Sequence, residues 1–268
     1  MAVVKGFQKV TGTIQNVTFY TVQGSDKVYM RTKGGPSKNR IKKDRSFEKL
    51  RRNNTEWKGC TMMTSQIRDS LFILKPMEDY PVCGALNGIN KQIQKTDTEG
   101  VHGKRGLYLS KNKDLLGGFS VSRKQELESV LRIPINATLD RDAGTAHIAL
   151  PSIETSMYLY NFQSLPYFRL VTKLTTVSDL EYSEEKGTYE LMHEVNLEGD
   201  ARFISEWIPS IGTIPAMNID LALPQIGFPL PDCVTLILGF GLEFAKPGAD
   251  GKPESVKYAG CGKVIRVG

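Results

Sequence analysis

The sequence predicts an α+β protein that is mostly β, with an N-terminal β-hairpin arm, a helical segment and a C-terminal antiparallel β-sandwich in the Ig or jelly-roll style. Three observations support this fold class. Runs of β-branched and aromatic residues flank a turn near the N-terminus, apolar residues then recur at helical spacing, and regularly spaced strands with Gly and Pro turns fill the second half. We place the three parts at residues 1–35, 36–132 and 133–268.

The composition is that of an ordinary globular protein. Of its 268 residues 40% are hydrophobic and 24% charged, which suits a packed core and not a disordered chain. The chain lacks a signal-peptide pattern and an apolar run of about 18 residues, so we expect a cytoplasmic protein without membrane contact. Later incorporation into a virion or an exported assembly stays open. The four scattered cysteines suggest buried free thiols and not a zinc site or disulfides.

Residues 10–31 are predicted to form the hairpin. Its arms carry large apolar side chains such as Phe19 and Met30, and residues 24–26 supply Gly, Ser and Asp for the turn. A two-stranded hairpin is only marginally stable alone. We therefore expect it to pack on its own domain or on a neighbouring subunit.

A basic patch follows the break at Gly34, Gly35 and Pro36. Residues 38–52 hold eight basic and two acidic residues, a net charge of +6 that equals that of the whole chain. The basic patch is Lys38, Arg40, Lys42, Lys43, Arg45, Lys49, Arg51 and Arg52. At the start of a helix these cations oppose the macrodipole, so helix stability does not explain them. A solvated segment, contact with nucleic-acid phosphates and contact with an acidic protein surface are the open interpretations.

Apolar residues at spacings of three, four and seven predict a long amphipathic helix over residues 46–74. Its stripe includes Leu50, Trp57 and Cys60, and Gly59 is a candidate break. A second, short helix is expected up to Lys95.

The second half is predicted to be strands separated by Gly and Pro turns. The expected strands are residues 133–140, 145–150, 168–177, 188–195, 217–223, 233–244 and 256–267. Gly239 and Gly241 interrupt the most apolar of these strands, and we expect them to allow a bend or a close approach of two chain segments.

No catalytic, cofactor or metal motif is present, and we predict that the protein is not an enzyme. The Gly-rich segment 98–118 departs from a phosphate-binding loop in the spacing of Gly100 to Lys104, so an exposed loop is expected. Two of the three histidines, His147 and His193, fall on predicted strands and are expected to be structural or merely exposed. The acidic pairs fall in turns or on strand faces, where carboxylates are normally solvated.

Three aromatic residues, Tyr158, Tyr160 and Phe162, alternate in the sequence. On a strand they would share one face. Such a face suits a sandwich core or a subunit contact, and it also suits a sugar-binding platform.

Short phrases spread over most of the chain carry a resemblance to a known family. They are Gly12-x-Ile14-x-Asn16, Tyr29-x-Arg31-x-Lys33-Gly34-Gly35, residues 63–71, His102-Gly-Lys-Arg-Gly106 and residues 258–266. In them the chain resembles an uncharacterised protein family of Bacteroidota or their phages. That family has no assigned activity, so the resemblance implies a bacterial or phage source and no functional residue.

The sequence thus favours a non-enzymatic structural subunit that engages neighbouring copies through its N-terminal arm and helix. We expect a homo-oligomer without cofactors. Two alternatives stay open: a nucleic-acid-associated protein that uses the basic patch, and a carbohydrate-binding sandwich that uses Tyr158 and Tyr160.

Overall fold

The computed structural model describes residues 2–4, 10–22, 25–32, 34–194, 201–224 and 229–268. They belong to two compact units, Met1–Arg51 and Arg52–Gly268. This division differs from the predicted boundaries after residues 35 and 132. The physical reason is that the helical segment shares a core with the second half of the chain, as shown below.

The first unit contains a four-stranded antiparallel sheet in the order β1-β4-β3-β2. Its strands are β1 (Ala2–Val4), β2 (Gly12–Ile14), β3 (Val17–Thr21) and β4 (Val28–Thr32). The predicted hairpin is the β3–β4 pair, in which Tyr20 lies opposite Tyr29 and their rings stack with centroids 5.8 Å apart. Ser25 of the predicted turn is described, whereas Gly24 lies outside the described residues.

The basic patch begins in a short helix of its own. Helix α1 (Lys38–Lys43) starts at the cap residue Ser37, whose hydroxyl accepts a hydrogen bond from the Arg40 N–H. A 3-10 turn, η1 (Arg45–Phe47), separates it from α2 (Glu48–Ser70). The expectation that the patch opens the long helix is met in part. Lys49, Arg51 and Arg52 lie at the start of α2, whereas Arg40, Lys42 and Lys43 occupy the last turn of α1, where the helix dipole favours them.

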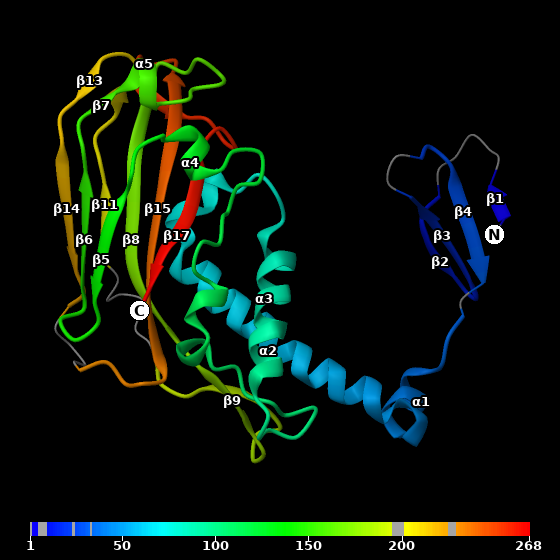
Figure 1. Cartoon of the computed structure of the whole chain (residues 1–268). Coiled ribbons are helices and arrows are strands. Elements are labelled where there is room, and N and C mark those ends of the chain that lie inside the picture. Colours follow the sequence, from blue (N-terminus) through cyan, green and yellow to red (C-terminus); the bar gives the residue numbers. More distant parts are fainter. Residues whose placement is uncertain (1, 5–9, 23–24, 33, 195–200, 225–228) are drawn as a thin grey trace. The chain divides into compact units, whose positions relative to one another are not determined.

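The second unit is built in three layers (Figure 1). The middle layer is an antiparallel sheet of β8 (Tyr167–Ser178), β11 (Ala201–Ile204), β12 (Ile208–Pro209), β15 (Val234–Pro247), β16 (Pro253–Ser255) and β17 (Cys261–Val267). One face packs on the sheet of β5 (Asn136–Asp140), β6 (Thr145–Leu150) and β14 (Met217–Ala222). The other face packs on α2, η2 (Phe72–Met77) and α3 (Val82–Thr96).

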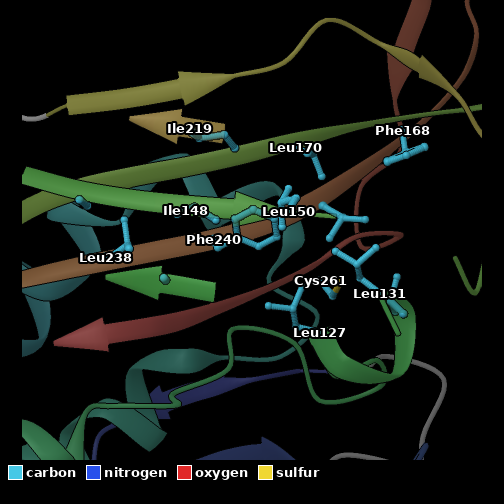
Figure 2. Close-up of a cluster of buried hydrophobic side chains, with 14 of the residues drawn as sticks. Leu127, Leu131, Ile148, Leu150, Phe168, Leu170, Ile219, Leu238, Phe240 and Cys261 are labelled. Atoms are coloured by element: carbon cyan, nitrogen blue, oxygen red, sulfur yellow. The ribbon is translucent and has the colours of Figure 1, made fainter. Parts of the chain in front are cut away.

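Alternation along the strands of the middle layer supplies both cores. On β8, Phe168 and Leu170 point into the space between the two sheets, where Figure 2 shows them with Leu150 and Phe240. Val171, the next residue along, is buried on the helix side. β15 is buried from residue 234 to 245 and reads as a nearly continuous apolar run, as a strand covered on both faces does. β8 was recognisable from its alternation instead, with Arg169 and Lys173 among its apolar residues.

The apolar stripe of α2 is part of this second core. Cys60, Met63 and Ile67 are buried against the sheet, whereas Leu50 and Trp57, which the spacing assigned to the stripe, are 42% and 47% exposed. The buried part of the helix is therefore already covered within the chain, and it is unavailable for the predicted contact with a neighbouring copy.

Glycines let the helical layer approach the sheet. A Cβ on Gly239 would lie 2.9 Å from Leu71 Cδ2, and one on Gly241 would lie 2.5 Å from Met77 Sδ. The predicted close approach of two segments at these glycines is confirmed. The expected break of the helix at Gly59 does not occur, because α2 runs through this residue. A Cβ on Gly59 would lie 2.8 Å from Leu107 Cδ1, so the glycine allows Leu107 to pack closely against α2.

The smaller elements connect these layers. They are η3 (Leu109–Lys111), η4 (Lys113–Leu115), α4 (Leu127–Val130), β7 (Ile153–Glu154), α5 (Thr155–Tyr158), β9 (Leu180–Ser183), β10 (Thr188–Leu191) and β13 (Thr213–Ile214). The segment 98–118, expected to be an exposed loop, buries Leu107 and Leu109 completely. That expectation is wrong because the segment closes one end of the helix-side core.

Candidate functional site

The basic patch divides into cations with structural contacts and cations without them. The Arg40 guanidinium donates to Asp44, at 3.1 Å from Nε to Oδ2, and hydrogen bonds from Ser46 together with this contact lower the pKa of Asp44. Arg51 donates to the Ile41 and Asp44 carbonyls at 2.7 and 2.8 Å, which caps the C-terminus of α1. Arg52, in the second unit, is exposed on α2.

The remaining patch residues are exposed and form no ion pair with any other described residue. They are Lys38, Lys42, Lys43, Arg45 and Lys49. Because their charges are not used to stabilise the unit, they are available to a partner.

The aromatic residues Tyr158, Tyr160 and Phe162 do not lie on a strand. Tyr158 ends α5, and the other two follow it in an irregular segment; their exposed fractions are 38%, 49% and 44%. They are therefore not part of the sandwich core. Arg132 lies over the Tyr160 ring, 5.3 Å from its centroid, and the subunit-contact and glycan interpretations of this group stay predictions.

A buried carboxylate, Glu56, binds two cations and a backbone N–H in the second unit. Its side chain is fully buried on α2, and the Arg105 guanidinium binds both oxygens, at 2.7 and 3.0 Å. Lys91 Nζ lies 2.5 Å from Oε2, and the Gly103 N–H donates to Oε1 at 2.9 Å. Burial alone would raise the pKa of Glu56, but these hydrogen bonds outweigh it and hold the pKa at about 2.

A second group of side chains surrounds this carboxylate. Gln94 donates to the Glu56 and Arg105 carbonyls and accepts from Lys91, and Tyr189 donates to the Arg105 carbonyl at 2.9 Å. Burial raises the pKa of Tyr189 and of Cys60, the latter to about 11, so both stay protonated near neutral pH. The cluster thus ties α2, α3 and the segment after α3 together, and it offers no activated nucleophile.

The histidines differ in their surroundings. His147 lies on β6 as predicted, with Nδ1 2.6 Å from Asp220 Oδ1 on β14, and both side chains are exposed. His193 follows β10 and is not on a strand, contrary to the prediction. His102 contacts Asn53 at 2.9 Å on the protein surface.

The four cysteines are free, as expected, but the expected burial holds only for Cys60 and Cys261, whereas Cys83 and Cys233 are partly exposed. Cys60 and Cys261 are fully buried, and burial raises the pKa of Cys261 to about 12. We predict that a thiol reagent at pH 8 modifies only Cys83 and Cys233 in the native protein, and that the other two react after denaturation. The Cys83→Ser, Cys233→Ser double variant should lose the fast phase, and fast modification of all four thiols would contradict this assignment.

A pocket of about 640 Å³ opens on the helix side of the middle sheet. It is lined by η2, β8, β11, β15 and the turn after β16. Its apolar lining comes from Phe72, Ile73, Pro76, Val171 and Ile204, with the Tyr258 ring beside them. Among the described lining residues, the cations are Lys75, Arg169, Lys173, Arg202 and Lys257, and the one acid is Glu243.

Glu243 is neutralised within the pocket wall. The Arg169 guanidinium binds Glu243 Oε2 at 2.6 Å and lies over the Trp207 ring, and the Ser255 hydroxyl donates to Oε1. The exposed cations Lys75, Arg202 and Lys257 therefore leave the rim positive.

Tyr258 has a left-handed backbone conformation, with φ of +63°. An L-residue there is strained by about 1 kcal/mol, yet the side chain is 62% exposed and its N–H bonds the Pro76 carbonyl at 3.2 Å. The strain holds an exposed ring at the edge of the pocket.

Sequence reasoning missed both of these features. Glu56 stands four residues before Cys60 in the buried stripe of α2, and a carboxylate in an apolar stripe signals a buried partner. The pocket residues gave no comparable signal, because they come from five separate segments.

No protein-family model, curated protein or solved structure matches this chain, so the resemblance to a Bacteroidota family stays a prediction. Among the described residues, no group of three or more His, Cys, Asp or Glu side chains is placed to hold a metal ion. Nor does any described helix combine the length and apolar character needed to cross a membrane.

Proposed function

We propose that this protein is a non-enzymatic assembly subunit whose N-terminal module, residues 1–51, docks onto a neighbouring copy. The observation that carries the proposal is the small number of buried side chains among the described residues of the module. Among the side chains described in it only Val28 is buried, whereas Val10, Ile14 and Val22 are 43%, 60% and 49% exposed. A small sheet needs an apolar face packed against another surface to be stable, and a partner that covers this sheet would supply one.

The distribution of charge favours a second copy as the partner. The module holds twelve Lys and Arg against three Asp and Glu, a net charge of +9, and residues 52–268 hold twenty-three against twenty-six, a net charge of −3. Opposite net charges on the two units favour a head-to-tail contact between copies. Lys38, Lys42 and Lys43 are the patch residues most suited to it, because they are exposed and take no part in capping.

Charge reversal of the module tests this proposal. We expect the full-length protein to sediment as a dimer or larger species at micromolar concentration in low salt. Changing Lys38, Lys42 and Lys43 to Glu should weaken association by about 2 kcal/mol, or about thirtyfold, since exposed charge pairs contribute up to about 1 kcal/mol each. A triple Glu variant at Lys58, Lys95 and Lys252, which changes the net charge equally, serves as control. A monomeric wild type, or equal loss in both variants, would refute the proposal.

Nucleic-acid binding is a second candidate function, favoured by the five exposed and unpaired cations of the patch. It predicts retardation of DNA or RNA by the full-length protein at low salt, with a log-log salt slope of about −0.9 per phosphate neutralised. The Lys38, Lys42 and Lys43 variant should then lose affinity more steeply than the control variant. A wild type that sediments as a monomer but retards nucleic acid would favour this function over self-assembly.

A further inference from the structure

We propose that the pocket beside η2 binds a small amphipathic carboxylate, with an apolar chain against the pocket wall and the carboxylate at its basic rim. This binding site is independent of the proposed docking of the N-terminal module. It lies within the second unit, and the lining residues named above are all described.

The pocket wall suits an apolar chain. Val171 forms part of it on the buried side, and Phe72 and Ile204 are 60% and 41% exposed although both are large and apolar. Grouped exposed apolar side chains mark binding surfaces more often than isolated ones do. The volume of about 640 Å³ lies within the roughly 300–1,000 Å³ of small-molecule sites.

The pocket rim suits one anionic group. Lys75, Arg202 and Lys257 are exposed there, and Arg202 and Lys257 form no ion pair with the described residues. Arg202 lies on β11 and Lys257 in the turn after β16, so cations from two separate segments face the pocket. Because Glu243 is already bound by Arg169 and Ser255, it does not neutralise this rim.

The size of the site favours a small ligand over a protein partner. A stable protein interface buries about 800 Å² on each side, which a single pocket of this kind does not provide.

Tyr258 gives a second reason to expect a ligand at this pocket. A strained residue that persists on the surface points to a role for its side chain, and here the side chain is one of those that line the pocket.

Calorimetric titration of the full-length protein with decanoate tests the site, with decanol as the uncharged probe of equal chain length. We expect decanoate to bind with a Kd of about 100 µM, a value reasonable for a ligand of this size. Decanol should bind at least about fivefold more weakly, because it lacks the charge that the rim recognises.

Two variants separate this site from non-specific binding to a basic protein. The Arg202→Gln, Lys257→Gln variant should weaken decanoate binding by about tenfold and leave decanol binding unchanged, whereas Lys42→Gln, Lys43→Gln removes the same charge from the module and should change neither. Ile204→Glu, at an exposed edge position, should abolish decanoate binding with the fold intact by circular dichroism. Absence of decanoate binding, equal binding of decanol, or equal effects of the two double variants would overturn the proposal.

Discussion

Replacing Glu56 with alanine is expected to lower the free energy of unfolding by about 3–5 kcal/mol, since removal of one partner leaves buried charge uncompensated. The Arg105 and Lys91 side chains would face a site that lacks their carboxylate. Urea denaturation followed by circular dichroism measures the change. Glu184→Ala is the matched control, because Glu184 also pairs with a lysine, Lys104, but is 71% exposed. Its removal should cost less than about 1 kcal/mol, and equal losses in both variants would contradict a special role of Glu56.

The same carboxylate should make the protein sensitive to acid. The pKa of Glu56 is about 2 in the folded chain against an ordinary value of 4.5. Its stabilising contribution is thus fully present above about pH 5 and is lost as the pH falls towards 2. The amount is roughly 3 kcal/mol. In Glu56→Gln this component is absent, so the difference in unfolding free energy between wild type and variant should shrink between pH 6 and pH 3. If the difference in unfolding free energy between wild type and variant stayed constant from pH 6 to pH 3, the low pKa of Glu56 would be contradicted.

Gly241→Ala is expected to destabilise the second unit by about 2–4 kcal/mol, as overpacking of a tight core does. The added Cβ would lie 2.5 Å from Met77 Sδ and 2.8 Å from the Cys261 carbonyl oxygen. The thioether can move, but the carbonyl belongs to the paired strand β17 and cannot move without disturbing the sheet.

The matched control is Gly88→Ala on α3, where nothing lies within 4 Å of the new Cβ. There alanine should stabilise the protein by up to about 1 kcal/mol, because it is the better helix former. Both changes are measured as shifts of the urea midpoint. Similar effects at the two positions would mean that chain stiffness and not packing governs Gly241.

Most of the longer strands could be predicted from the local periodicity of the sequence. β8 and β15 were predicted because alternating and apolar runs of this kind are a property of neighbouring residues. The N-terminal hairpin followed from turn chemistry in the same way, and the exposed basic patch from simple counting of charge. The strands β7, β11, β12 and β13 were not predicted, since the two to four residues in each are too few to show a period.

Contacts between distant segments decided the remainder. Glu56 is neutralised by Arg105, which lies forty-nine residues later in the chain. The apolar stripe of α2 is buried by a sheet that the second half of the chain forms. The sequence alone therefore determined the long helix and the longer strands, the positive charge of residues 38–52 and the close packing at Gly239 and Gly241. Only the tertiary structure decided that the helices form a third layer and that five segments enclose a basic-rimmed pocket, because burial and charge pairing depend on which segments meet in space.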